Sequence, residues 1–389
     1  MPHHNFIITP HSIHTPTAIV HTEYDPTTLD PVPSPAWTRF VCISDTHARS
    51  FDVPPGDVLL HSGDLTSRGT VAEFRKTVDW LCGLPHKVKI IIAGNHDITL
   101  HEGWYDKNPL RWHRDVGKQD RAAILQLLKG PRAVASGLVY LESEEHVFQV
   151  KDGGRTWSVY GSPWSPYFCN WAFNYKPEDG PALIAKFPKT DILLTHGPAH
   201  HILDRTNHGD LPGCPALRAR LPDLRPRIHV AGHIHEGRGA YVHAWTGTGG
   251  EGEGRGEGEG KEGEGEAPRV QNDNWYRDSD SDSDLDEDDE DEGDGEEDEH
   301  ADEAEDEGER EGENELGVTP LPHPPPPTPV DRTVFVNAAT FPSGRHAWRG
   351  VRVKGLHACH GVLVEDREER MKVPFGGPGF QAVVVDLLD

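Results

Sequence analysis

Short apolar runs alternate with polar turn residues along most of the chain. Between residues 38 and 245 each run is followed directly by Gly, Asp, Ser or His. Runs of this kind predict buried strands, although periodicity alone does not distinguish them from short helical pieces. The predicted strands are 39–44, 57–61, 88–93, 157–160, 191–195 and 228–231, with two more at 333–337 and 382–387.

Two segments between these runs have helical periodicity. In residues 70–84 apolar residues recur at spacings of three and four until Gly83 and Pro85. Residues 121–129 form a second such segment, which Gly130 and Pro131 end. Apolar residues at these spacings form one face of a helix, and Gly and Pro are common where helices stop. Strands that alternate with helices predict an α/β sandwich.

A long segment in the second half of the chain has a different composition. Residues 246–330 are mostly Gly, Glu, Asp, Ser and Pro. Such a segment cannot bury enough apolar surface to offset chain entropy, so we expect it to be disordered. Because strands are predicted on both sides of it, we expect an insertion that divides one domain into residues 38–245 and 331–389. Residues 1–37 are expected to be an irregular lead-in with a short strand at 5–9.

The net negative charge of the chain comes from that insertion. Between Glu251 and Leu316 there are 33 acidic and five basic residues, which accounts for the formal net charge of −27. The near-neutral remainder lacks the basic surface that duplex-binding proteins need, so we do not expect duplex nucleic acid as a partner. The insertion itself is suited to binding basic protein partners.

Cysteine usage and hydropathy indicate the compartment. The five cysteines are scattered and form no C-x-x-C pair, which indicates a reducing compartment. No stretch approaches the roughly 20 apolar residues of a membrane helix, and the N-terminus lacks a secretory-signal pattern. We therefore expect a cytoplasmic protein, with the nucleus as the alternative, and no membrane partner.

Five short polar clusters lie at or directly after the ends of predicted strands. Together they contain three Asp, one Asn and five His, and four of the clusters include a Gly. In open α/β sheets, ligands bind outside the carboxyl ends of the strands. Carboxylates and imidazoles in this mixture suit Mn²⁺, Fe or Zn²⁺ better than Ca²⁺ or a thiolate site. The clusters are Asp45-Thr46-His47, Gly63-Asp64, Gly94-Asn95-His96-Asp97, Thr195-His196-Gly197 and Gly232-His233-Ile234-His235.

This ordered set resembles the calcineurin-like metallophosphoesterase superfamily. The pattern of that superfamily is D-x-H, G-D, G-N-H-[DE], a lone His before Gly, and G-H-x-H; this chain has SDTH, SGDL, GNHD, THGP and GHIH. The further segments YGSPWSPYF, HEGRG and VNAAT are similar to the small metallophosphoesterase-domain subfamily of animal brain proteins and many fungi. Some members have Gly in place of the first His of G-H-x-H, whereas this chain has His233. The resemblance covers residues 38–243 and 332–388 and implies a four-layer α/β/β/α sandwich.

The resemblance also implies a site for two divalent metal ions, with Mn²⁺ expected first and Fe or Zn²⁺ as alternatives. Asp64 is expected to bridge both ions, because a carboxylate has two oxygens to share. His96 is expected to contact the phosphate or protonate the leaving group rather than bind metal, with Asp97 orienting its ring through a ring N–H. One ion is expected on Asp45, His47 and His235, and the other on Asn95, His196 and His233.

These roles imply a hydrolase of phosphoric esters, and a phosphodiesterase rather than a monoesterase. Hydroxide held between the two ions would attack phosphorus in line. The expected substrate is a small phosphate ester, with a nucleotide as one option. The sequence leaves open a rival from another class, a regulatory or scaffold protein that uses the fold as a platform and the acidic insertion for partner binding. A nuclease is a third reading, which the near-neutral body disfavours.

Overall fold

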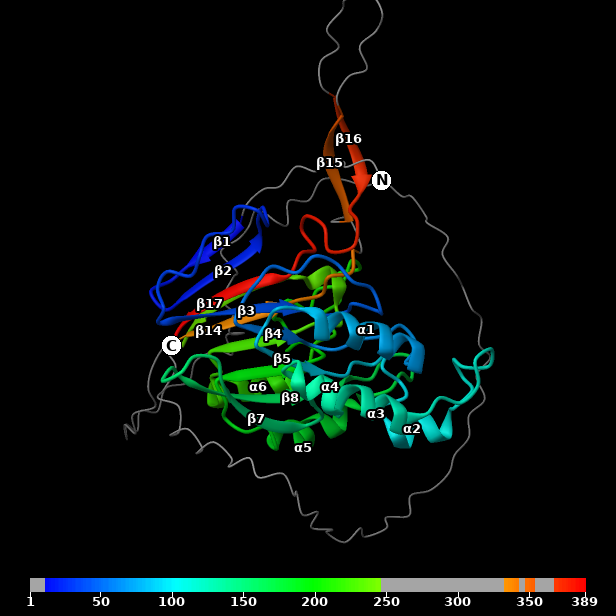
Figure 1. Cartoon of the computed structure of the whole chain (residues 1–389). Coiled ribbons are helices and arrows are strands. Elements are labelled where there is room, and N and C mark those ends of the chain that lie inside the picture. Colours follow the sequence, from blue (N-terminus) through cyan, green and yellow to red (C-terminus); the bar gives the residue numbers. More distant parts are fainter. Residues whose placement is uncertain (1–10, 246–331, 343–346, 354–366) are drawn as a thin grey trace, which may run out of the picture. The chain divides into compact units, whose positions relative to one another are not determined.

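The computed structural model describes residues 11–245, 332–342, 347–353 and 367–389 (Figure 1). The strand predicted at 5–9 and the disordered insertion predicted at 246–330 lie outside these residues. No helix in the described part of the chain is long and apolar enough to cross a membrane. The eight strands and two helices predicted within the described residues are all present, with boundaries that differ by up to two residues.

The first sheet has seven strands, and four of them run parallel as neighbours: β3, β4, β5 and β6. Strand β17 lies antiparallel between β2 and β3, so the end of the chain forms an inner strand. Strand β4 is buried along its whole length, as expected for a parallel strand covered on both faces. In order across the sheet the strands are β1 (His11–His14), β2 (Ala18–Glu23), β17 (Val383–Leu388), β3 (Trp37–Ile43), β4 (Val58–His61), β5 (Val88–Ile92) and β6 (Leu138–Leu141).

The second sheet has six strands, and its centre is again parallel. Strands β8, β11, β12 and β14 are parallel neighbours, and β13 and β7 pair antiparallel at the two edges. Strand β14, which follows the acidic segment in the sequence, pairs with β12 and β13, which precede it. In order the strands are β13 (Gly239–Ala244), β14 (Arg332–Asn337), β12 (Ile228–Ala231), β11 (Ile192–Thr195), β8 (Thr156–Ser162) and β7 (Glu144–Gln149).

Apolar side chains fill the spaces between the layers of the fold. The first cluster lies between the sheets, where the rings of Phe40 and Trp157 meet edge to face with centroids 4.9 Å apart. The second packs helices on the outer face of the first sheet, and the third packs helices on the outer face of the second sheet. The predicted four-layer α/β/β/α sandwich is therefore confirmed. The helices over the first sheet are α1 (Val71–Gly83), α2 (Glu102–Lys107), α3 (Arg121–Lys129) and α4 (Pro131–Ala135); those over the second are α5 (Gly180–Ala185) and α6 (Pro215–Leu224).

Local sequence explains where α1 begins. The Thr70 side chain accepts a hydrogen bond from the Glu73 backbone N–H, and the Glu73 carboxylate accepts one from the Thr70 N–H. This capping box satisfies two donors that the first turn leaves without helical partners. The smaller elements are β9 (Ser165–Pro166), β10 (Asn174–Tyr175), β15 (Trp348–Val353), β16 (Arg367–Lys372) and the 3₁₀ turns at Pro177–Asp179 and His235–Gly237.

The expectation of an irregular lead-in is wrong for residues 11–23, which form β1 and β2. Strand β2 pairs with β17 at the far end of the chain, with Val20 opposite Val385, and both residues are fully buried. This strand was not predicted because only its first three residues, Ala18 to Val20, are apolar, so the segment contains no apolar run of ordinary strand length.

Candidate metal centre

The five polar clusters converge at the carboxyl ends of the central strands. Asp45 follows β3, Asp64 follows β4 and Asn95 follows β5, three parallel neighbours in one sheet. His196 follows β11 and His233 follows β12, which are parallel neighbours in the other sheet. Because parallel strands end at the same edge of a sheet, each sheet delivers its side chains to one end of the sandwich.

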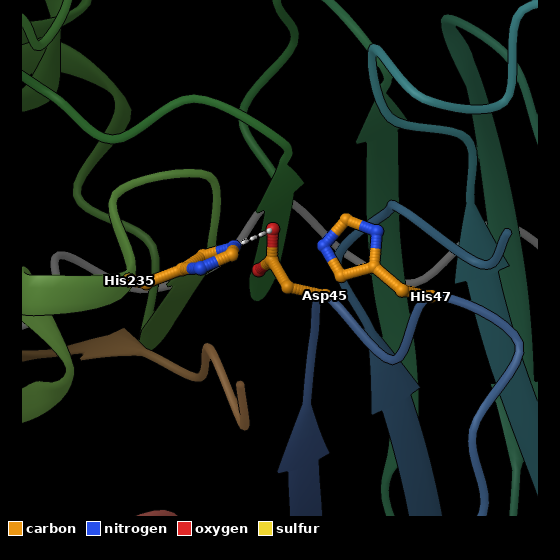
Figure 2. Close-up of side chains that lie close together, drawn as sticks. All are labelled: Asp45, His47 and His235. Carbon is orange, nitrogen blue, oxygen red and sulfur yellow. Dashed lines mark ion pairs between the residues drawn. The ribbon is translucent and has the colours of Figure 1, made fainter. Parts of the chain in front are cut away.

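Carboxylates line the buried side of the centre. Asp45 has no exposed surface and Asp64 is 2% exposed. The Asp45 Oδ1 lies 3.3 Å from the His235 Nε2, and Figure 2 shows the carboxylate between the rings of His47 and His235. The two oxygens of Asp64 face different histidines, since Oδ2 is 3.9 Å from the His47 Nε2 and Oδ1 is 3.5 Å from the His196 Nε2. Asp64 therefore stands between two groups of imidazoles.

Among the described residues, three trios of side chains have ligand atoms within 4.8 Å of one another, which is close enough to share an ion. One trio belongs to the first predicted ion, and another joins both carboxylates to a histidine of the second. The remaining trio includes His96, so geometry alone does not reserve that residue for proton transfer. The trios are Asp45, His47 and His235; Asp45, Asp64 and His196; and His47, Asp64 and His96.

Backbone carbonyls fix which ring nitrogen faces the centre. The His196 Nδ1–H donates to the Ser62 carbonyl at 2.9 Å, which leaves Nε2 only 2.8 Å from the Asn95 Oδ1. The His47 Nδ1–H donates to the Thr66 carbonyl at 3.3 Å. A histidine that ligates a metal usually donates its other ring N–H in this way, which sets the tautomer and aims the lone pair.

The backbone around the centre is strained and closely packed. Asp45, His47, Asp64 and His233 all have positive φ angles, between 46° and 68°, a region that costs energy for residues other than Gly and is found at functional sites. A Cβ on Gly232 would clash with the Asp45 carboxylate. A Cβ on Gly94 would clash with Asp64 in the same way. These two glycines therefore leave room for the carboxylates.

Electrostatics favour ionised carboxylates at Asp45 and Asp64 and neutral imidazoles at His47 and His233. Burial alone would raise the pKa of Asp45, but the hydrogen bond from His235 and the nearby imidazoles outweigh burial and hold it below the usual value. Burial alone would lower the pKa of His235, but the hydrogen bond to Asp45 outweighs burial, and the net effect raises the pKa. Burial lowers the pKa of His47 to about 4 and that of His233 to about 3. Ionised carboxylates and neutral imidazoles are the forms that bind a cation.

The predicted contact between Asp97 and the ring of His96 is wrong. The His96 Nδ1–H donates to the Ser67 carbonyl at 2.8 Å. The buried Asp97 carboxylate instead accepts hydrogen bonds from the backbone N–H groups of Leu65, Thr66 and Gly94 and from the Thr66 hydroxyl. Asp97 thus joins the loop after β4 to the loop after β5, because its side chain points back into the fold.

Two contributors to the centre come from the C-terminal part of the chain. The Asn337 Nδ2 donates to the Ile234 carbonyl at 2.8 Å and to the Leu203 carbonyl at 2.9 Å, and so supports the loop that carries His233 and His235. The Phe341 ring packs at 5.3 Å from the ring of His235. Asn337 lies in the VNAAT segment, whereas no pattern in the sequence indicated Phe341.

Comparison with known proteins shows the family of the chain. The family model described as calcineurin-like phosphoesterase matches residues 38–237, and the chain belongs to that family. Metallophosphoesterase domain-containing protein 1 of Homo sapiens is 37% identical over 238 residues, which are 56% of this chain and 68% of that protein. UPF0046 protein T07D4.2 of Caenorhabditis elegans is 36% identical over 236 residues, 56% of each chain. Among solved structures, TT1561 of Thermus thermophilus gives a TM-score of 0.34 at 11% identity, over 53% of this chain and 84% of that one.

The family and the potential metal ligands together define a metal-dependent phosphoesterase. Carboxylates and imidazoles, with no thiolate among them, form the trios at the carboxyl ends of the strands. This chemistry suits a hydrolytic divalent metal rather than a redox cluster.

Proposed function

We propose that this protein is a phosphodiesterase that uses two divalent metal ions, with Mn²⁺ as the first choice. The observation that carries the proposal is the position of Asp64, whose two oxygens face histidines of the two expected ligand groups. A carboxylate placed in this way is suited to bridging two cations. The substrate we propose is a small phosphate diester, with a nucleotide as one option.

The residues present fit two such ions. Each expected group offers one carboxylate or amide oxygen and two imidazoles in addition to the shared carboxylate, and the glycine positions leave space around both carboxylates. When bound, the ions would lower the pKa of water and neutralise the oxygens of the phosphate. Asp45, His47 and His235 would hold one ion, Asn95, His196 and His233 the other, and Asp64 both.

His96 is proposed as the general acid. Its Nδ1–H is engaged by the Ser67 carbonyl, so Nε2 is the ring nitrogen left to face a substrate. As the bond between phosphorus and the leaving oxygen breaks, the proton on Nε2 of the imidazolium would pass to that oxygen. The backbone N–H of His96 also donates to the Asp64 Oδ1 at 2.8 Å, which ties the acid to the proposed bridging ligand.

The first experiment is a titration of metal-free protein with Mn²⁺, with hydrolysis of bis-(p-nitrophenyl) phosphate and p-nitrophenyl phosphate followed side by side. Faster turnover of the diester supports a phosphodiesterase, whereas preference for the monoester would replace the proposal with a phosphatase.

A His96→Ala variant should lose far more rate on methyl phenyl phosphate than on methyl p-nitrophenyl phosphate, because only the poorer leaving group needs the proton. Equal losses would remove His96 from the role of acid, and loss of bound metal would place it among the ligands.

The alternative function is that of a regulatory or scaffold protein. It is favoured by the 33 acidic residues between Glu251 and Leu316, a charge density suited to basic partners. Deletion of residues 246–329 separates the two proposals. A phosphodiesterase should keep its turnover after the deletion, whereas a scaffold should bind metal, turn over neither ester and lose its partner.

A further inference from the structure

The ring of His96 is held on several sides at once. Its Nδ1–H donates to the Ser67 carbonyl, and the rings of His96 and His47 meet edge to face with centroids 4.8 Å apart. Its face lies against Trp171, with centroids 4.2 Å apart and planes inclined by 32°. Trp171 is thus the aromatic ring that covers a face of the proposed acid.

Trp171 is itself fixed from behind. Its ring stacks on Trp112 with centroids 4.7 Å apart and planes only 6° from parallel. The Arg111 guanidinium lies 5.5 Å from the centre of the Trp112 ring and donates to carbonyls of the loop before Trp171. The backbone N–H of Trp171 donates to the Asn174 Oδ1 at 3.2 Å, which fixes the main chain as well. A column of packed rings therefore ends at His96.

From this geometry we infer that Trp171 is a positioning residue for His96, an inference that rests on the proposed function. The hydrogen bond at Nδ1 fixes one edge of the imidazole, whereas a flat surface against one face also restricts tilting of the ring plane. Trp171 takes the orienting role that the resemblance implied for Asp97. It does so by packing against the face of the imidazole rather than by accepting a hydrogen bond from the ring. Its ring packs at a tilt against His96 and stacks on Trp112, and neither of these is an expected metal ligand.

Orientation matters for proton transfer because the donor must lie within hydrogen-bond reach of the leaving oxygen. Displacement of a reacting group by about 1 Å can cost about 100-fold in rate. Removal of the Trp171 ring should therefore lower kcat for methyl phenyl phosphate by about 10- to 100-fold, within the range that a general acid contributes. KM and bound metal should stay unchanged, and methyl p-nitrophenyl phosphate, whose leaving group needs no proton, should be hydrolysed at nearly the original rate.

The test compares Trp171→Leu, Trp171→Phe and Trp164→Leu in the full chain. Trp171→Leu should show the selective loss, and Trp171→Phe should recover most of it because a phenyl ring still covers the imidazole. Trp164 is the matched control, since it lies between β8 and β9 in the same part of the chain and packs on His101 and Phe173 instead. If Trp171→Leu slows both diesters equally, or slows neither, the inference is wrong.

A second readout does not depend on activity. In metal-free protein the ring protons of His96, assigned by comparison with His96→Ala, should carry a ring-current shift that Trp171→Phe retains in part and Trp171→Leu abolishes. Unchanged His96 signals in Trp171→Leu would overturn the inference even if the kinetics changed. If the wild type hydrolyses neither diester, the proposed function fails, while these signals still decide whether Trp171 positions the ring.

Discussion

Replacement of Asp64 by Asn removes one charge from the centre while keeping the shape of the side chain. The Asn Oδ1 can still accept the hydrogen bond from the His96 N–H, which is 2.8 Å in the wild type. The second oxygen, which faces His47 at 3.9 Å, becomes an NH₂ group that cannot bind a cation. The Asn Oδ1 also carries no net charge, so the contacts with both ions lose their charge. If each loss is worth about as much as a charge-assisted hydrogen bond, about 1.5 to 3 kcal/mol, the two together cost about 3 to 6 kcal/mol. This corresponds to a loss of about 10²- to 10⁴-fold in metal affinity.

The same change should cost the metal-free protein only a modest part of its stability. Burial, together with repulsion from Asp45, acts against ionisation of Asp64, although the surrounding histidines outweigh both and lower its pKa. A lowered pKa in the folded state means that the ionised carboxylate stabilises the fold at neutral pH. We therefore expect metal-free Asp64→Asn to unfold at a slightly lower denaturant concentration than the wild type.

Unfolding by urea, with and without Mn²⁺, measures both effects in one assay. Wild-type protein should gain about 2.7 kcal/mol when free Mn²⁺ is 100-fold above its Kd, and Asp64→Asn should gain almost nothing at the same concentration. Asp191→Asn is the matched control, because Asp191 is also buried but lies before β11, at the opposite end of that strand from His196. This control should lose stability yet keep the Mn²⁺ response.

Two results would refute the reasoning about Asp64. One is an Asp64→Asn protein that keeps the full Mn²⁺ stabilisation and the wild-type turnover of bis-(p-nitrophenyl) phosphate. The other is a metal-free variant far less stable than the wild type, which would make Asp64 a structural carboxylate rather than a ligand.

Three further predictions concern the surroundings of the centre. Burial lowers the pKa of His61 and of His229 from 6.5 to about 3, so below pH 6.5 the unfolded chain binds protons that the folded chain does not. The free energy of unfolding of the metal-free protein should therefore fall by on the order of 1 kcal/mol per pH unit for each residue. Urea midpoints that do not change between pH values of about 7 and 5 would contradict this. Gly232→Ala should abolish Mn²⁺ binding, because the added Cβ clashes with Asp45; a normal metal content by elemental analysis would show that the loop adapts. Asn337→Ala should cost about 1 to 3 kcal/mol for each carbonyl that loses its donor and should weaken Mn²⁺ binding, whereas a loss of stability with unchanged affinity would limit Asn337 to a structural role.

Much of the fold and the donor set could be predicted because their signals are local. Each predicted strand within the described residues is a short apolar run, and each expected ligand follows such a run within a few residues, as Asp45 follows β3 and His196 follows β11. Parallel strands in an α/β sheet end at the same edge, so order along the sequence was enough to predict proximity in space. Helix α1 could be predicted for the same reason, since its periodicity and its capping residues are neighbours in the chain.

Long-range contacts decided the features that could not be predicted from the sequence. Asp97 follows His96 directly, yet its carboxylate turns away to the loop after β4, and the ring of His96 rests on Trp171, 75 positions later. Strand β2 became visible only through its pairing with β17, and Asn337 reaches the loop of His235 only because β14 lies beside β12. The sequence by itself therefore determined which side chains are available to a metal and at which strand ends they stand. The tertiary structure alone decided how those side chains are oriented, because orientation depends on packing between segments whose separation in the chain leaves no periodic signal.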